Sequence, residues 1–126
     1  MNRPPLPINR ARISRIAEGV VAHTLRKLPK NVGDAAQNCA INLVWSGDDV
    51  CEGSGDDLLG WFDGVSVKET DGTEFPPKIF LVLDRLWEFS ERRPALFEQE
   101  VAVTLLHELG HYLGLDEDEI ADRGLA

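Results

Sequence analysis

The chain has 126 residues, of which 43% are apolar, and its formal net charge is −9 at pH 7. This length suits one domain with one core, and the apolar content excludes global disorder. An acidic protein repels phosphate backbones, so we expect no nucleic-acid partner. No apolar run reaches the ~18 residues of a membrane helix, and the basic N-terminus lacks the apolar stretch of a signal peptide. We therefore expect a cytoplasmic protein that binds no membrane.

The charge is unevenly distributed along the chain. Residues 1–30 have a net charge of +6, whereas residues 31–126 have a net charge of −15. Acids cluster at 48–57 and at 116–122, and the usual role of such runs is solvated surface. The two cysteines, Cys39 and Cys51, are expected to be thiols in a reducing compartment.

The N-terminal part predicts a flexible tail followed by a helix. Residues 1–9 contain three prolines and are expected to be flexible, before a single domain over residues 10–126. Apolar side chains recur at intervals of three and four over residues 10–28, which predicts an amphipathic helix. Pro29 ends this pattern because proline disrupts a helix interior.

The middle of the chain predicts short strands. Residues 41–45 and 78–83 are apolar runs next to turn-forming residues, so each is expected to be a strand. Between them, Asp63-Gly64 lies within residues 58–67, and this dipeptide between apolar runs indicates a hairpin.

The C-terminal part predicts a long helix. Pro94 suits a first helical turn, and Gly114 suits the position just after a helix, so we expect a helix over residues 94–113. Shorter helical turns are expected at 84–93 and 116–123. Helices and strands do not alternate regularly, so the fold class is α+β, with a small, twisted, mostly antiparallel sheet packed on two helices.

The most informative motif is His107-Glu108-Leu109-Gly110-His111, an H-E-x-x-H pattern within the predicted helix. Residues four apart share one helical face, so both imidazoles can bind one metal ion. Glu108 lies about 100° around the helix, where it can accept a proton from a water on the metal. The motif therefore predicts a Zn²⁺ site with Glu108 as the catalytic base.

A third ligand is expected among the acids that follow Gly114. Counted from His107 as the first position, Glu117 is the eleventh, where related families place His or Asp. Glu117 is the first choice and Asp116 the second. Carboxylates are ordinary zinc ligands.

On these residues the chain resembles the small, single-domain bacterial zincin-like metallopeptidases. The resemblance rests mainly on residues 105–114 and the acids that follow them, with support from the segments at 58–65 and 78–83. It implies a minimal zincin-like fold, whose edge strand borders the cleft, and zinc held by His107, His111 and the following acid. The family pattern has Asp where this chain has Glu117.

The leading hypothesis is a zinc-dependent metallopeptidase that hydrolyses peptides or unfolded proteins. An extended substrate is expected along a sheet edge near Trp61, and Gly110 is expected to permit close approach beside the metal. Two alternatives stay open: a zincin-like module that binds peptides without cutting them, and, with less support, a small zinc ribonuclease. Whether the protein forms a homodimer also stays open.

Overall fold

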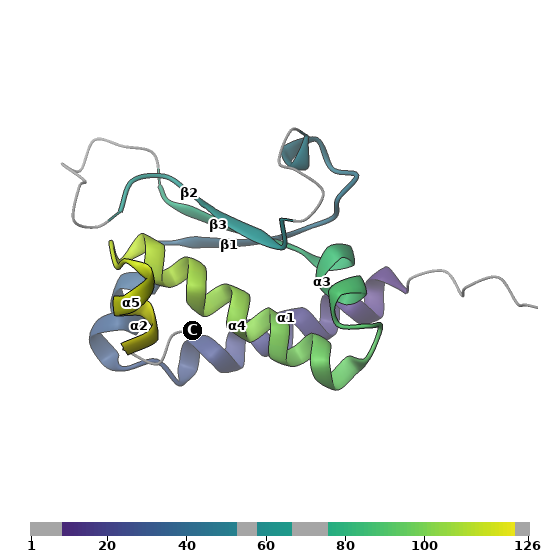
Figure 1. The fold of residues 1–126 in the computed structure, drawn as a ribbon, viewed down its shortest axis with the longest axis horizontal. Coiled ribbons are helices and arrows are strands. Elements are labelled where there is room, and N and C mark those ends of the chain that lie inside the picture. Colours follow the sequence, from purple (N-terminus) through teal and green to yellow (C-terminus); the bar gives the residue numbers. More distant parts are fainter. Residues whose placement is uncertain (1–8, 53–57, 67–75, 123–126) are drawn as a thin grey trace, which may run out of the picture.

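The structure is a computed structural model, and it describes residues 9–52, 58–66 and 76–122. Figure 1 shows a small sheet lying along one side of α4, with α1 packed beside the same helix. None of the helices in the described part is long and apolar enough to cross a membrane. The elements are, in chain order, α1 (Arg10–Arg26), α2 (Lys30–Ala36), β1 (Ala40–Val44), the 3-10 turn η1 (Asp49–Cys51), β2 (Gly60–Asp63), β3 (Lys78–Val82), α3 (Leu83–Phe89), α4 (Pro94–Tyr112) and α5 (Glu117–Asp122).

Helix α1 begins with a side-chain cap. The Asn9 carboxamide oxygen accepts a hydrogen bond from the Arg12 backbone N–H at 3.0 Å, so one of the unpaired N–H groups of the first turn is satisfied. The helix buries Ile13 and Ala17 in the core. The predicted tail thus ends at a capping residue, and residues 1–8 lie outside the described part of the chain.

The sheet is mixed, with strand order β1-β3-β2. Strand β2 pairs with β3 antiparallel, and β1 pairs with β3 parallel. The α+β class is confirmed, but the expectation of a mostly antiparallel sheet is corrected. Because β3 inserts between two strands that run in opposite directions, it must be parallel to one of them.

The predicted hairpin at Asp63-Gly64 is also corrected. Strand β2 ends at Asp63, and its partner is β3 rather than the residues directly after the turn. Gly64 has φ +139°, and a Cβ there would lie 3.1 Å from the Pro77 Cα. Glycine is thus required where the chain leaves β2, but β2 and its antiparallel partner β3 are separated by residues 64–77 rather than by a tight turn.

Helix α4 lies against the sheet and α1. Pro94 occupies its first turn, as predicted, where the missing N–H leaves no intrahelical bond unmade. Phe97, Val101 and Leu105 are four residues apart and fully buried, so they form the row that faces the core. This row fixes the rotation of α4 and therefore which of its side chains face outward.

Candidate metal centre

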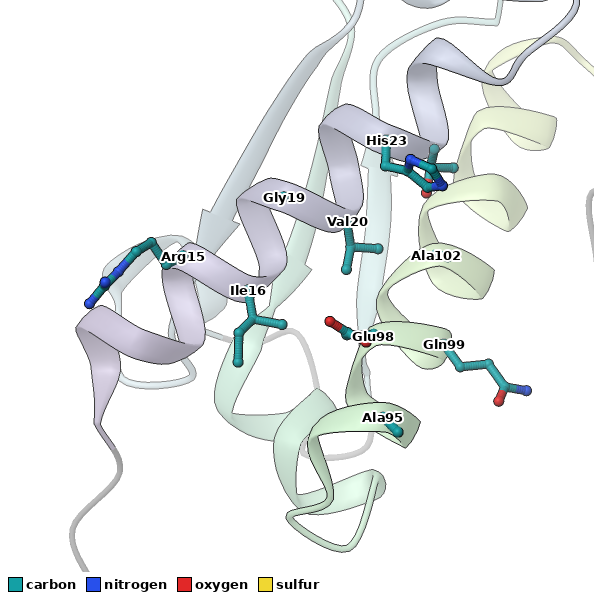
Figure 2. A pocket seen from close by; sticks show the side chains of 10 residues that line it. Arg15, Ile16, Gly19, Val20, His23, Ala95, Glu98, Gln99 and Ala102 are labelled. Carbon is teal, nitrogen blue, oxygen red and sulfur yellow. The ribbon is translucent and has the colours of Figure 1, made fainter.

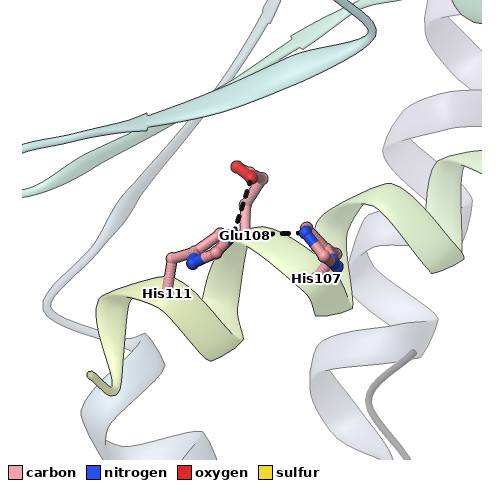
Figure 3. Close-up of side chains that lie close together, drawn as sticks. All are labelled: His107, Glu108 and His111. Carbon is pink, nitrogen blue, oxygen red and sulfur yellow. Dashed lines mark hydrogen bonds and ion pairs between the residues drawn. The ribbon is translucent and has the colours of Figure 1, made fainter. Parts of the chain in front are cut away.

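The last two turns of α4 bring three potential metal ligands together. His107, Glu108 and His111 each offer a ligand atom, and these atoms lie within 4.8 Å of one another. The two His rings lie edge to face, with 4.7 Å between centroids and 83° between planes. Their Nε2 atoms are 3.1 Å apart. Figure 3 shows both imidazoles converging along one side of the helix.

The spacing of the two nitrogens fits a zinc ion. Two nitrogens that each lie 2.0–2.1 Å from a tetrahedral ion are about 3.3 Å apart. The observed 3.1 Å between the Nε2 atoms of His107 and His111 is within a few tenths of an ångström of this value. The helix therefore holds both imidazoles close to the arrangement that coordination needs, without a change of backbone.

Glu108 is the buried member of the cluster. The residue is 8% exposed, and its Oε1 lies 3.9 Å from the His111 Nε2. Its side chain points from α4 toward the sheet (Figure 3). The Glu108 carboxylate is close to the two imidazole nitrogens, but it projects from a different face of the helix. It can therefore accept a proton from a water that lies beside these nitrogens.

Strand β2 lies directly over Glu108. A Cβ on Gly60 would lie 3.0 Å from the Thr104 Cγ2, so the strand and the helix are in close contact there. Further along the strand, the rings of Phe62 and Tyr112 are 5.6 Å apart. Thr104, Glu108 and Tyr112 are four residues apart and share one row of α4. The two contacts therefore lie on either side of Glu108 and place the strand above it.

The chain turns sharply after His111. Gly114 has φ +77°, a conformation that glycine adopts without steric cost. The Gly114 N–H donates to the His111 carbonyl at 2.9 Å, and the Leu115 N–H donates to the Gly110 carbonyl at 3.0 Å. These two bonds form a Schellman motif, which satisfies the last carbonyls of α4 and reverses the chain toward α5.

Asp116 caps the helix that follows. The Glu119 backbone N–H donates to the Asp116 Oδ1 at 2.8 Å, and the Asp116 N–H donates to the Glu119 Oε1 at 3.4 Å. This reciprocal pair is a capping box, and the spacing D-x-x-E before a short helix is the signal in the sequence that could have indicated it. Among the described side chains, Asp116 is not part of the metal cluster. Glu117 is the first residue of α5, and its side chain lies outside the described part.

Comparison with known proteins identifies the family. The model of the zincin-like metallopeptidase family matches residues 46–125, which is well over half of the chain. The chain belongs to this family. Among curated proteins, none matches the chain. The match spans the sheet strands β2 and β3 and the metal cluster of α4, so the expected zincin-like fold is confirmed.

Trp61 and Gly110 were also predicted as site residues of this zincin-like protein, and the structure places only Gly110 within the helix that carries the metal cluster. The Trp61 ring stacks on Phe80 at 4.7 Å, on the face of the sheet opposite α4, so its side chain points away from the metal cluster. Gly110 is buried within α4, and its carbonyl accepts the Leu115 N–H in the turn after the helix. The backbone of Trp61, rather than its indole, lies near the cluster.

The cysteines of this zincin-like protein are separate from the metal cluster. Neither Cys39 nor Cys51 forms a disulfide, in agreement with the predicted thiols, and both are buried. Burial raises the pKa of the Cys39 thiol to about 11. A thiol with such a pKa stays protonated near neutral pH, and only the thiolate is a good zinc ligand.

Proposed function

We propose that this zincin-like protein is a zinc-dependent peptidase that hydrolyses peptide bonds in extended or unfolded substrates. One observation supports this most strongly: two imidazole nitrogens converge to 3.1 Å beside a buried carboxylate. His107 and His111 would hold the zinc ion. When bound, zinc supplies a Lewis acid and lowers the pKa of a coordinated water toward ~7.

Glu108 is the proposed general base. Its carboxylate accepts a proton from the attacking water and returns it to the leaving amine when the peptide bond breaks. The side chain is held in place by burial beneath β2, so it needs little reorganisation before the proton moves.

Glu117 is the proposed third zinc ligand. The Schellman turn at Gly114 reverses the chain, so the start of α5 comes back toward the end of α4. Asp116 is the weaker candidate because its carboxylate already accepts the Glu119 N–H as a helix cap. Coordination by Asp116 would compete with this cap.

Among the described residues, β2 is an edge strand of the sheet, and its outer edge is the proposed substrate-binding edge. The Val82 N–H donates to the Leu59 carbonyl at 2.8 Å, which marks Leu59 and Val82 as a hydrogen-bonded antiparallel pair. Such pairs alternate, so Trp61 also bonds to β3, and the N–H and C=O groups of Gly60 and Phe62 point to the other side. A peptide added as a strand would bond to these four groups.

This strand position would bring a substrate over the two histidines. The core row of α4 runs through Val101 and Leu105, and the row beneath β2 runs through Glu108. Each residue advances about 100° around the helix, so His107 and His111 lie on the far side of Glu108 from the core row. A peptide on the open edge of β2 would therefore extend above the imidazoles.

The test compares cleavage by the wild type and Glu108→Gln. The zinc-loaded proteins are incubated with a panel of unfolded proteins, and the products are identified by mass spectrometry. We expect Glu108→Gln to bind one zinc ion but to cleave about 10²–10⁴-fold more slowly, because only the base is lost. Glu98→Gln, the same change on an exposed part of α4, is the control and should cleave as the wild type does.

Two results would contradict the proposal. Equal cleavage by the wild type and Glu108→Gln would exclude Glu108 as the base. Peptide capture without cleavage by the zinc-loaded wild type would instead support a peptide-binding module, which the open edge of β2 could also provide.

A further inference from the structure

A groove runs between the exposed sides of α1 and α4, on a side of the molecule that the metal cluster does not occupy. Its volume is about 610 Å³, and half-buried Ile16, Val20 and Ala102 line it. Ala102 and His107 are five residues apart, or about 140° around α4. The groove is therefore a separate surface from the proposed active site.

One residue of the α1 wall of the groove has no side chain. Gly19 lies in the middle of α1, and a Cβ added there would have no atom within 4 Å. Helix interiors disfavour glycine, and no close packing within the described chain requires one at this position. The missing side chain leaves room for another backbone or side chain to approach α1.

The two walls of the groove have opposite charges. Of the residues that line the groove, Arg15 on the α1 side carries a positive charge and Glu98 on the α4 side carries a negative charge, and both are exposed. Arg12 and Arg26 fall on the same face of α1 by their helical spacing. Figure 2 shows Glu98 turned toward the groove, whereas Arg15 reaches outward. Within the described residues, no ion pair joins Arg15 or Glu98 to another side chain.

We propose that this groove is the interface between two copies of the chain. A two-fold axis along the groove places α1 of one copy opposite α4 of the other, so that each basic wall faces an acidic wall. Arg15 of each copy then lies opposite Glu98 of its partner. An acidic helix of another protein would be repelled by Glu98, and a basic helix would be repelled by the arginines of α1. A second copy of this chain carries both charges in the complementary arrangement, so the charge pattern favours it.

The size of this surface predicts a weak dimer. Helix α1 has 17 residues and is about 25 Å long, so the face formed by two adjacent helices is smaller than a standard interface of ~800 Å² per partner. We therefore expect a dissociation constant in the micromolar range. Both metal clusters would remain on the outside of the dimer.

Sedimentation equilibrium of variants in which the charges at Arg15 and Glu98 are reversed, singly and together, tests the proposal. The full-length chain is measured over about a hundredfold range of concentration around the micromolar region. We expect the wild type to approach twice the monomer mass. Arg15→Glu and Glu98→Arg should each weaken association at least tenfold, because each places like charges opposite one another. The double variant should recover most of the wild-type association.

Lys30→Glu is the matched control, since it makes the same change of charge outside the groove lining and should leave association unchanged. A wild type that stays monomeric at every concentration would overturn the proposal. A dimer that is insensitive to both single variants, or single variants that the double variant does not rescue, would also overturn it. These outcomes are independent of zinc binding and of cleavage.

Discussion

Asp116 and Glu117 are adjacent acids with different positions relative to α5. Asp116 precedes the helix and accepts the Glu119 N–H at 2.8 Å, whereas Glu117 is the first helical residue. A carboxylate that caps a helix is oriented by the backbone, so it is less available to an ion beside α4. The two acids therefore have separable roles, one in the turn and one in the proposed zinc site.

A pair of substitutions separates these roles. Asn caps helices as well as Asp does, so Asp116→Asn should keep the turn and leave zinc affinity unchanged. Glu117→Gln should weaken zinc binding by about 100-fold or more. Loss of a residue that merely hydrogen-bonds to a metal ligand already costs about 10–100-fold in affinity, and loss of a ligand itself should cost more. A competition titration with a chelator measures both affinities.

Asp118→Asn is the control, because it removes the same charge from an exposed neighbour and should not change zinc affinity. Weaker zinc binding by Asp116→Asn together with normal binding by Glu117→Gln would assign the third ligand to Asp116 instead.

Strand β2 is a short element, but its position determines what lies above Glu108. Gly60 allows it to approach both β3 and α4: an added Cβ would lie 2.7 Å from the Phe80 carbonyl oxygen and 3.0 Å from the Thr104 Cγ2. The backbone oxygen cannot move away without disturbing the sheet. Because Gly60 has no side chain, the strand can lie close above Glu108.

Two glycine substitutions, which should change the free energy of unfolding in opposite directions, test the role assigned to Gly60. Gly60→Ala should lower the free energy of unfolding by about 1–3 kcal/mol, because the new methyl group overlaps its neighbours. Gly19→Ala should raise it by up to about 1 kcal/mol, because a Cβ there meets nothing and alanine favours the helix. Urea unfolding, at a concentration where the chain is monomeric, measures both changes. Equal effects of the two substitutions would contradict this interpretation of Gly60.

The elements that the sequence predicts well are those with local signals. Helix α4 has Pro94 in its first turn and Gly114 after its end, and the i, i+4 spacing alone brings His107 and His111 together. Helix α2 was not predicted, because it contains Gly33, a poor helix former, in only seven residues. Such a short helix depends on tertiary packing rather than on propensity.

The partner of β2 and its place over Glu108 could not be predicted for a different reason. The pairing of β2 with β3 and the contact between Phe62 and Tyr112 join segments that are distant in sequence. Hydrophobic periodicity shows which face of a strand is buried, but it does not show which strand lies beside it. The sequence therefore predicts which side chains of α4 come together better than it predicts the surface that would bind a substrate.

At the scale of the whole molecule, α4 separates two surfaces. One side has the metal cluster beneath the edge of the sheet, and another side borders the groove with the basic helix α1. The net charge of −9 is thus the sum of a basic helical face and an acidic remainder, which includes the acids after Gly114. This division allows association through one surface without covering the other.

The central claim is that α4 holds a zinc ion through His107 and His111. X-ray absorption at the zinc edge, on the chain loaded with one equivalent of zinc, tests it most directly. We predict a shell of nitrogen and oxygen at about 2.0–2.1 Å, with the signature of two imidazoles, and the loss of one imidazole in His111→Ala. A sulfur shell at about 2.3 Å, or an identical spectrum for His111→Ala, would contradict the claim.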